Sequence, residues 1–278
     1  MIFSWWQKIS AVTTAYPLAL LLILSFAGKS TASDLLREQR IADEIEEAIL
    51  VGYPLRLTAE GIEFLAIHTE ATTPQVHGAA VLLHGHGANP DWTDVIQPLR
   101  STLPDRGWET LSIQLPVASA DAADGSGAAL IPESFPRIGA AIDFLLKRGV
   151  KSVVVVGHSL GARMGVEYSA AGDLPTEVRG LVAIGLSADR QQRDSGTLLA
   201  LSNMRLPLLD IYGSRDAETV LNSVGARLTA SQRGGNAGYR QLEVNGANHF
   251  FSGMDEELVA RVNAWMRKVA QSAPAQQQ

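Results

Sequence analysis

Three side chains of this sequence have the types and the chain order that acyl-transfer chemistry requires. Ser159 comes first, Asp216 follows, and His249 is last. A serine hydroxyl is a weak nucleophile at its own pKa, so it needs a histidine as base, and the histidine needs a carboxylate that fixes its tautomer and stabilises the imidazolium. We therefore predict Ser159 as nucleophile, His249 as base and Asp216 as the acid that orients His249.

The residues around Ser159 predict a sharp turn between a strand and a helix. Four β-branched residues, Val153–Val156, precede the serine, and a helix-compatible run begins at Leu160. Gly157 and Gly161 flank Ser159 because a Cβ at either position would collide with so tight a turn. The pentapeptide alone also fits an ordinary turn with a serine N-cap. The strand, the helix and the downstream partners favour a nucleophile.

Alternatives exist for the acid. Asp216 follows the predicted strand 206–212 through a short turn, where its carboxylate can reach a histidine on the next loop, although it could also cap the following helix. Asp210 lies inside that strand and is the lesser candidate. Asp189 follows the strand 180–186 and would have to reach from one strand further back.

The other histidines fit the role of base less well than His249, which follows an alternating strand. His68 and His77 precede the third strand and have the wrong chain order. His158 lies inside the turn and cannot curl back onto its neighbour. His84 is predicted to be structural, with backbone groups as its partners.

With these features the sequence resembles the α/β-hydrolase superfamily over most of residues 55–270. The upstream run His84-Gly85-His86-Gly87 fits the resemblance, which implies that a His-Gly-x-Gly loop supplies one oxyanion donor. By position this donor is the backbone N–H of His86, and the second is the N–H of Leu160. Two such donors stabilise a tetrahedral intermediate by several kcal/mol. The side chain of His86 either lines the pocket or fills space.

A second resemblance is to a functionally uncharacterised bacterial family within that superfamily. It rests on Asp91-Trp92, on Pro98-Leu99-Arg100 and on the run Gly107–Pro116. It implies no known substrate.

Alternating strand and helix patterns predict an α/β protein with the α/β-hydrolase fold. The sheet is expected to be mostly parallel, with helices on both faces. An amphipathic helix over 33–50, with Ser33 as N-cap, should precede it. The predicted strands are 55–57, 62–67, 79–84, 108–115, 151–156, 180–186, 206–212 and 239–244, and the later helices lie near 91–103, 133–148, 160–171, 216–232 and 253–270.

Two connections bear on the substrate. The segment 187–205 has room for one short helix, so we expect a small cap or none. The segment 117–132 is rich in Ala, Asp and Gly, and we expect a flexible, acidic loop near the site. An open, weakly acidic mouth suits a short or exposed acyl group.

Composition limits the remaining options. With 278 residues and 46% hydrophobic content the chain can form one core, so residues 33–270 are predicted to be a single domain. The absence of cysteine excludes disulfides, a thiol nucleophile, Cys-ligated zinc and a lipoprotein anchor. Neither a metal-ligand cluster nor a phosphate-binding glycine loop stands out, so we expect no cofactor. The tail 271–278 is predicted to be disordered.

The N-terminus predicts export. Residues 9–27 carry no charge, and small residues precede Ser33, so we expect a signal peptide over 1–32 with cleavage after Ala32. An uncleaved anchor in the inner membrane is the alternative. Losing Lys8 and Lys29 with this segment changes the net charge from −6 to −8. No Lys/Arg cluster stands out, so nucleic acid is not an expected partner, and a membrane is expected only through an uncleaved segment.

The sequence thus predicts a periplasmic or secreted serine hydrolase, carboxylesterase-like, that acts on a small-molecule or envelope acyl substrate. An amidase, a peptidase or an acyltransferase would use the same triad, so these activities stay open. A non-catalytic hydrolase-like domain that binds an envelope component is the alternative from another class.

Overall fold

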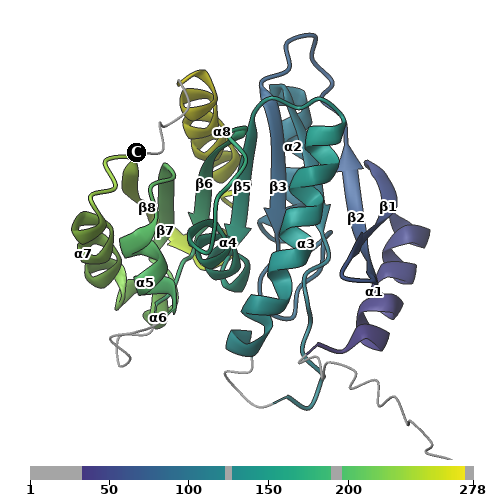
Figure 1. Ribbon diagram of the computed structural model, residues 1–278, viewed down its shortest axis with the longest axis horizontal. Coiled ribbons are helices and arrows are strands. Elements are labelled where there is room, and N and C mark those ends of the chain that lie inside the picture. Colours follow the sequence, from purple (N-terminus) through teal and green to yellow (C-terminus); the bar gives the residue numbers. More distant parts are fainter. Residues whose placement is uncertain (1–32, 123–126, 189–195, 273–278) are drawn as a thin grey trace, which may run out of the picture. The chain divides into compact units, whose positions relative to one another are not determined.

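An eight-stranded sheet forms the centre of the body in the computed structural model (Figure 1). The structure describes residues 33–122, 127–188 and 196–272. These belong to one compact unit that starts at Thr31. The predicted signal segment 1–32 and the tail residues 273–278 lie outside the described residues.

The strands follow the spatial order β1-β2-β4-β3-β5-β6-β7-β8. β2 pairs antiparallel with both of its neighbours, and the pairs from β4–β3 to β7–β8 are parallel. This confirms the mostly parallel sheet. The strands are β1 Tyr53–Ala59, β2 Ile62–Thr69, β3 Gly78–Leu83, β4 Trp108–Ile113, β5 Val153–His158, β6 Val178–Ile184, β7 Leu208–Arg215 and β8 Tyr239–Asn248.

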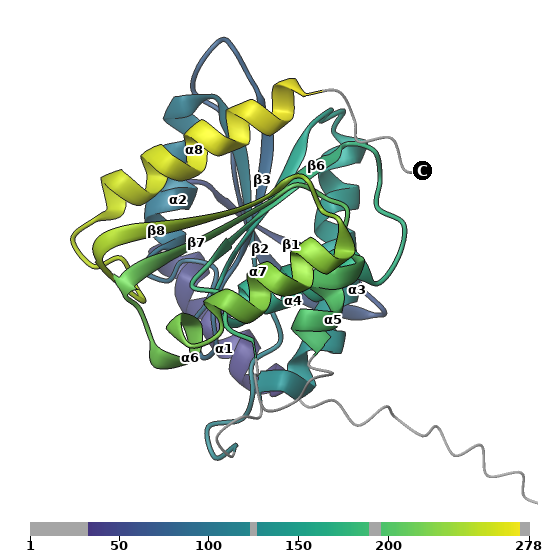
Figure 2. The ribbon, with the colours of Figure 1, turned by 90° about the vertical axis from the view of Figure 1, so that its left-hand side faces the viewer.

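Helices cover both faces of this sheet, as Figure 2 shows. One layer contains α3, α4, α5 and α7, and the other contains α2 and α8. The helices are α1 Leu35–Ala48, α2 Ile96–Thr102, α3 Gly127–Lys147, α4 Leu160–Ala170, α5 Gly196–Asn203, α6 Glu218–Leu221, α7 Val224–Gly234 and α8 Asp255–Gln271, and a short 3₁₀ helix covers Leu103–Arg106.

The valines of β5 show why both faces need covering. Val153 and Val155 pack into the core beneath α3 and α4, whereas Val154 and Val156 pack into the core beneath α2 and α8. Successive side chains of a strand point to opposite faces, so an unbroken run of valines needs apolar partners on both sides. All four side chains are fully buried.

The chain changes direction across the sheet at β3. It passes from β3 to β4 on one side and returns to β5 on the other. The connections that leave the carboxyl ends of β3 and β5 therefore diverge, and such a switch point is where open α/β sheets bind ligands. The two connections carry His84–Ala88 and Ser159.

Three local predictions were wrong. The N-cap of α1 is Asp34 and not Ser33, because Asp34 Oδ1 accepts the N–H of Arg37 at 2.9 Å while Ser33 forms a β-bridge with Ala118. The helix predicted over 216–232 is divided into α6 and α7. The segment 117–132 is a loop only in part, because α3 already begins at Gly127.

Two prolines are the reason that the early start of α3 was not predicted from the sequence. Pro132 and Pro136 both lie inside the helix, and a proline in a helix interior removes a backbone hydrogen bond and clashes with the carbonyl four residues before it. The pattern therefore indicated a loop. Leu130, Ile131 and Ile138 are nevertheless buried against the sheet, and this apolar burial outweighs the local cost.

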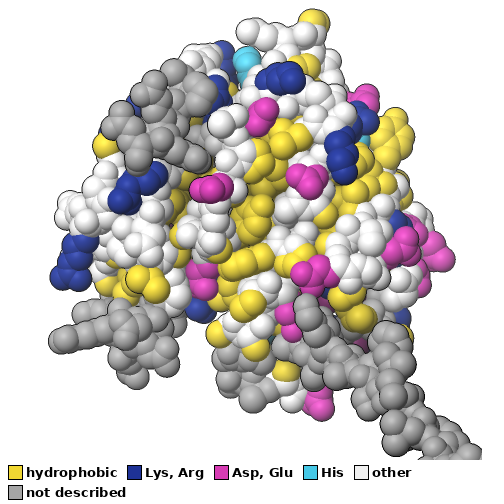
Figure 3. Space-filling view, viewed as in Figure 1, with side chains coloured by type: hydrophobic (Ala, Val, Ile, Leu, Met, Phe, Trp, Pro, Cys, Tyr) yellow, Lys and Arg dark blue, Asp and Glu magenta, His cyan; other side chains and the backbone are white. Residues whose placement is uncertain are grey.

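The surface carries mixed charge. On the face shown in Figure 3, the basic side chains of the described residues stand among acidic and hydrophobic ones rather than in a stripe. Among the described helices, none is both long and apolar enough to cross a bilayer.

Candidate functional site

Ser159 occupies a strained turn between β5 and α4. Its φ of 55° and ψ of −115° fall outside the regions that L-residues prefer. The backbone N–H of Ser159 donates to the carbonyl of Ile184 on β6, and this bond ties the turn to the neighbouring strand. The predicted strand–serine–helix turn is therefore present.

The turn depends on close contacts between backbones. A Cβ on Gly157 would lie 2.5 Å from the carbonyl oxygen of Gly161, and a Cβ on Gly161 would overlap the carbonyl oxygens of Leu83 and His84. Neither Cβ would fit, because a normal van der Waals contact between such atoms is at least about 3.4 Å. Glycine at these two positions is what lets α4 start directly against the end of β3.

His249 bridges Ser159 and Asp216. Its Nδ1 lies 2.6 Å from Asp216 Oδ1, and its Nε2 lies 3.0 Å from Ser159 Oγ. The carboxylate accepts the Nδ1–H, which leaves Nε2 free to accept the serine O–H. The three residues come from the ends of β5, β7 and β8. The structure thus brings together the three side chains that the sequence singled out.

The surroundings of Asp216 favour its charged form. Burial by itself would raise the pKa of this carboxyl, but the hydrogen bond with His249 and the N–H groups of Gly213 (3.1 Å) and Ala217 (2.7 Å) bring it below its ordinary value. The side chain of Asp216 is fully buried, whereas that of His249 is 19% exposed. A charged acid therefore lies behind a partly exposed histidine.

The alternative acids are placed differently. Asp210 is fully buried and forms an ion pair with Arg227, whose Nε lies 2.8 Å from Asp210 Oδ2. Tyr239 donates a further hydrogen bond to the same oxygen at 2.6 Å. Asp210 thus joins β7, β8 and α7. Asp189 lies outside the described residues.

Two other histidines lie near the amino ends of the parallel strands, away from the carboxyl ends where Ser159 lies. His68 Nε2 is 2.6 Å from Glu109 Oε1, and the ring of His77 lies tilted against that of Trp108, with 5.8 Å between the ring centroids. Glu109 and Trp108 begin β4, whereas Ser159 follows the carboxyl end of β5. Neither histidine is near the serine.

The loop after β3 lies against the serine turn. A Cβ on Gly85 would lie 3.3 Å from Ser159 Cβ, and one on Gly127 would lie 3.1 Å from Leu160 Cδ2 and 3.3 Å from His86 Cδ2. The side chains of His86 and Leu160 therefore flank the first residue of α3. Leu160 also begins α4, and the first N–H groups of a helix have no partner within it.

His84 holds this loop in place, as predicted. Its Nε2 accepts the N–H of Leu115 at 3.0 Å, and its Nδ1 donates to the carbonyl of Gly85 at 2.9 Å. Burial lowers the pKa of His84 to about 4, so the ring is neutral at pH 7. A neutral ring supplies one donor and one acceptor, which matches these two bonds.

Sequence reasoning excluded His158 as base and overlooked its structural contacts. Its ring packs 4.9 Å from that of His249, and its Nε2–H donates to the backbone carbonyl of His249 at 3.0 Å. Burial lowers the pKa of His158 to about 4. One signal for this contact was present in the sequence. His158 directly precedes Ser159, so its side chain was bound to lie close to the residues that follow the other strands.

Phe250 was also missed. Its ring is 41% exposed and lies edge-on to the imidazole of His249 at 5.2 Å. A large apolar side chain that stays exposed beside a polar site is a candidate surface for an apolar part of a ligand. No group of acids and histidines among the described residues is arranged to hold a metal ion.

The neutral His158 predicts a pH-dependent stability. Its folded pKa of about 4 lies below the ordinary 6.5, so its contribution is present above pH 6.5 and is lost as the pH falls toward 4. The stability advantage of the wild type over His158→Gln should shrink by about 3 kcal/mol between pH 7 and pH 4. Urea unfolding at each pH measures it, and a constant difference across this window would contradict the neutral ring.

The solved structures that superpose on this chain include α/β hydrolases. An α/β serine hydrolase homologue from Coxiella burnetii superposes with a TM-score of 0.61 at 15% identity, over 80% of this chain and 99% of that one. The esterase domain of a Rhodothermus marinus protein gives 0.59 at 16% identity, over 80% and 100%. An α/β serine hydrolase without a lid from Xanthomonas campestris gives 0.58 at 15% identity, over 82% and 99%. These likenesses confirm the α/β-hydrolase fold.

Comparison of the sequence with family models assigns the chain to a family within this fold. A search of curated proteins finds no match. The model of a family described as protein of unknown function (DUF3530) matches residues 54–134 and 128–268, which include Ser159, Asp216 and His249. Because the match spans most of the sequence, the chain belongs to the DUF3530 family, an uncharacterised family with the α/β-hydrolase fold.

Proposed function

We propose that this protein is an exported serine hydrolase that cleaves an ester or a related acyl bond. The observation that carries the proposal is the chain of hydrogen bonds from Ser159 through His249 to Asp216. In this geometry a base lies within proton-transfer distance of the hydroxyl and a carboxylate orients the base. The strained backbone of Ser159 adds support, because such strain is concentrated at functional sites.

The proposed reaction has two halves. Ser159 Oγ attacks the acyl carbon while its proton passes to His249 Nε2, and the resulting imidazolium is stabilised by the charged Asp216. Collapse of the tetrahedral intermediate breaks the bond to the leaving group, which takes the proton from His249. Water then attacks the acyl-serine with His249 again as base, and releases the acid and the free serine.

The negative charge of the tetrahedral intermediate needs fixed donors. We assign this role to the backbone N–H groups of His86 and Leu160. Support comes from the contact of the His86 loop with the serine turn and from the place of Leu160 at the start of α4. The helix N-terminus also favours a negative charge there.

The substrate proposal rests on the described residues near the site. Between β6 and β7 the described residues form α5, which has eight residues and packs in the helix layer that covers the sheet. Phe250 offers an exposed aromatic surface beside His249. We propose a short or exposed acyl substrate that packs an apolar part on Phe250.

The first prediction concerns the nucleophile. A fluorophosphonate probe should label Ser159, because an activated serine attacks phosphorus as it attacks an acyl carbon. Ser159→Ala should lose both labelling and ester turnover, and intact-protein mass spectrometry with an ester assay measures them. Ser169→Ala, in the helix α4 that follows Ser159, is the matched control and should keep both. A folded wild-type protein that is unlabelled, or labelled elsewhere, would contradict the hydrolase proposal and favour a binding domain.

The second prediction concerns the acid. Asp216→Asn should lower kcat by roughly 10³–10⁴-fold with little change in KM, because an amide favours the wrong tautomer of His249. Asp173→Asn is the control, since Asp173 is exposed between α4 and β6 at the other end of the strands. Near-normal turnover of Asp216→Asn would refute the assignment of this acid.

The third prediction concerns export, which rests on the uncharged segment 9–27. N-terminal sequencing of the protein from its native host should give Ser33 or a residue close to it. A protein that retains Met1 and fractionates with membranes would replace the cleaved signal by an anchor. A cytoplasmic protein that retains Met1 would refute export in either form.

A further inference from the structure

The end of β6 lies between the two elements that carry the serine and the acid. β6 runs between β5 and β7 in the sheet (Figure 1). Ser159 follows β5, and Asp216 follows β7. Neighbouring strands are about 4.8 Å apart, so β5 and β7 are separated by roughly 10 Å. The ring of His249, which is hydrogen-bonded to both side chains, therefore has to cross the end of β6.

Gly185 is the first residue after β6, and it lies against this ring. A Cβ on Gly185 would be 2.9 Å from Cε1 of His249 and 3.0 Å from its Nδ1. The same Cβ would be 3.7 Å from Asp216 Oδ2, so the position adjoins the hydrogen bond between the histidine and the acid. Carbon atoms in contact are about 3.5–4.0 Å apart, so a side chain here would displace the ring by roughly 0.6–1 Å.

Backbone hydrogen bonds hold Gly185 in this place. Its N–H donates to the carbonyl of Ile211 on β7 at 2.9 Å, and the preceding carbonyl, that of Ile184, accepts the N–H of Ser159 at 2.8 Å. Ile184 and Ile211 are fully buried, so a shift of Gly185 would disturb the packed interior. The side chain of His249 is 19% exposed, and it is therefore the group that a new side chain would displace.

The backbone conformation of Gly185 is a separate reason for glycine at this position. Its φ is 60°, a value that L side chains rarely adopt. Gly235 after α7 has a φ of 72°, and a Cβ there would meet no atom within 4 Å. Gly235 thus shares the backbone requirement of Gly185 and lacks the contact with a histidine, which makes it a matched control.

We propose that Gly185 is a positioning residue of the active site. It keeps the end of β6 free of a side chain, so that His249 can bridge Ser159 and Asp216. The inference rests on the proposed function, because it takes His249 as the base. Gly185 touches neither the acyl group nor the attacking oxygen in this scheme, and it acts only through the place that it leaves for the imidazole.

Kinetics of alanine variants measure this role. Gly185→Ala should lower kcat by about 10–100-fold with little change in KM, because a misplacement on the order of 1 Å costs about 100-fold and substrate binding does not require the proton transfer. Gly235→Ala introduces comparable backbone strain and should keep kcat within about twofold of the wild type. Equal kcat values in the two alanine variants would overturn the proposal.

A double-mutant cycle separates positioning from a general loss of structure. In Asp216→Asn the histidine is already misoriented, so Gly185→Ala should lower the rate of fluorophosphonate labelling by less than about threefold in that background, against about tenfold or more in the wild type. A general loss of structure would lower both rates by the same factor, and equal factors would refute the positioning role.

Unfolding in urea tests the contact without any assay of activity. Gly185→Ala should lower the midpoint more in the wild type than in His249→Ala, because the second variant lacks the ring that the methyl group meets. Gly235→Ala should lower it equally in both backgrounds. If Gly185→Ala alone does not fold, adding His249→Ala should restore folding. Equal losses in the two backgrounds, or a double variant that stays unfolded, would refute the contact. A wild type that no fluorophosphonate labels would instead refute the hydrolase proposal, and the urea result would still decide whether Gly185 sets the place of His249.

Discussion

The geometry of the serine turn is set by the close approach of α4 to the end of β3. Gly161 meets the carbonyl oxygens of Leu83 and His84, and Gly157 meets Gly161. Any side chain at these positions would push the helix away from the sheet. Because contact is made by backbone atoms, Ser159 is held between two rigid elements and its φ of 55° is maintained by its surroundings.

Burial and hydrogen bonding decide which ionisable side chains around Ser159 are charged. The two fully enclosed imidazoles, His84 and His158, have a lowered pKa of about 4 and act as neutral hydrogen-bond donors to backbone carbonyls. Asp216 is equally enclosed, but two backbone N–H groups and His249 keep its pKa low. One charged carboxylate thus lies behind His249, where its hydrogen bond with Nδ1 fixes the tautomer of that ring.

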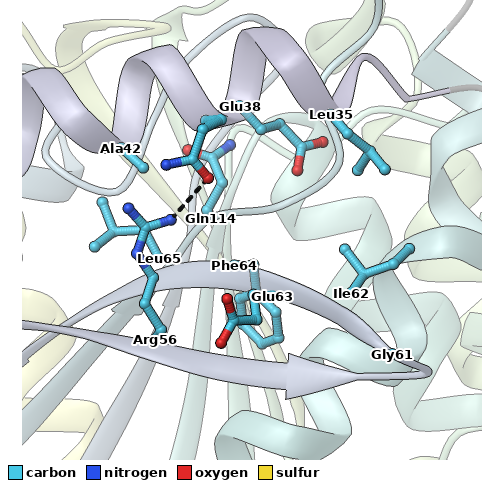
Figure 4. A pocket seen from close by; sticks show the side chains of 11 residues that line it. Leu35, Glu38, Ala42, Arg56, Gly61, Ile62, Glu63, Phe64, Leu65 and Gln114 are labelled. Atoms are coloured by element: carbon cyan, nitrogen blue, oxygen red, sulfur yellow. Dashed lines mark hydrogen bonds between the residues drawn. The ribbon is translucent and has the colours of Figure 1, made fainter.

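The N-terminal helix α1 is bonded to the chain just beyond the carboxyl end of β4, at the end of the parallel strands where Ser159 lies. Glu38 of α1 lines a pocket between this helix and the hairpin of β1 and β2 (Figure 4). It binds the N–H of Val117 and the guanidinium of Arg137 of α3, and Asp34 binds the carbonyl of Val117 through its N–H. Burial raises the pKa of Glu38, although Arg137 and the N–H of Val117 oppose this. These bonds hold the segment after β4 against α1 as it leaves the sheet, so α1 has a role in fixing its path.

The fold and the proposed triad were predictable because each rests on local signals. Valine runs mark buried strands, the glycines mark the turn at Ser159, and chain order separates His249 from His68 and His77. The contacts of Asp210 and His158 were not predictable, because their partners Arg227 and His249 come from distant parts of the chain.

The strands and the serine turn could be predicted because neighbours along the chain set them, and the order of the three candidate residues is read directly from the sequence. Only the packing of distant segments sets the course of α3 through two prolines, the neutral form of two histidines, and the burial of Gln114 Oε1 without a hydrogen-bond partner among the described residues. Each of these depends on which surfaces are buried together, and burial sets both the pKa of an imidazole and the energy of an unpaired carbonyl.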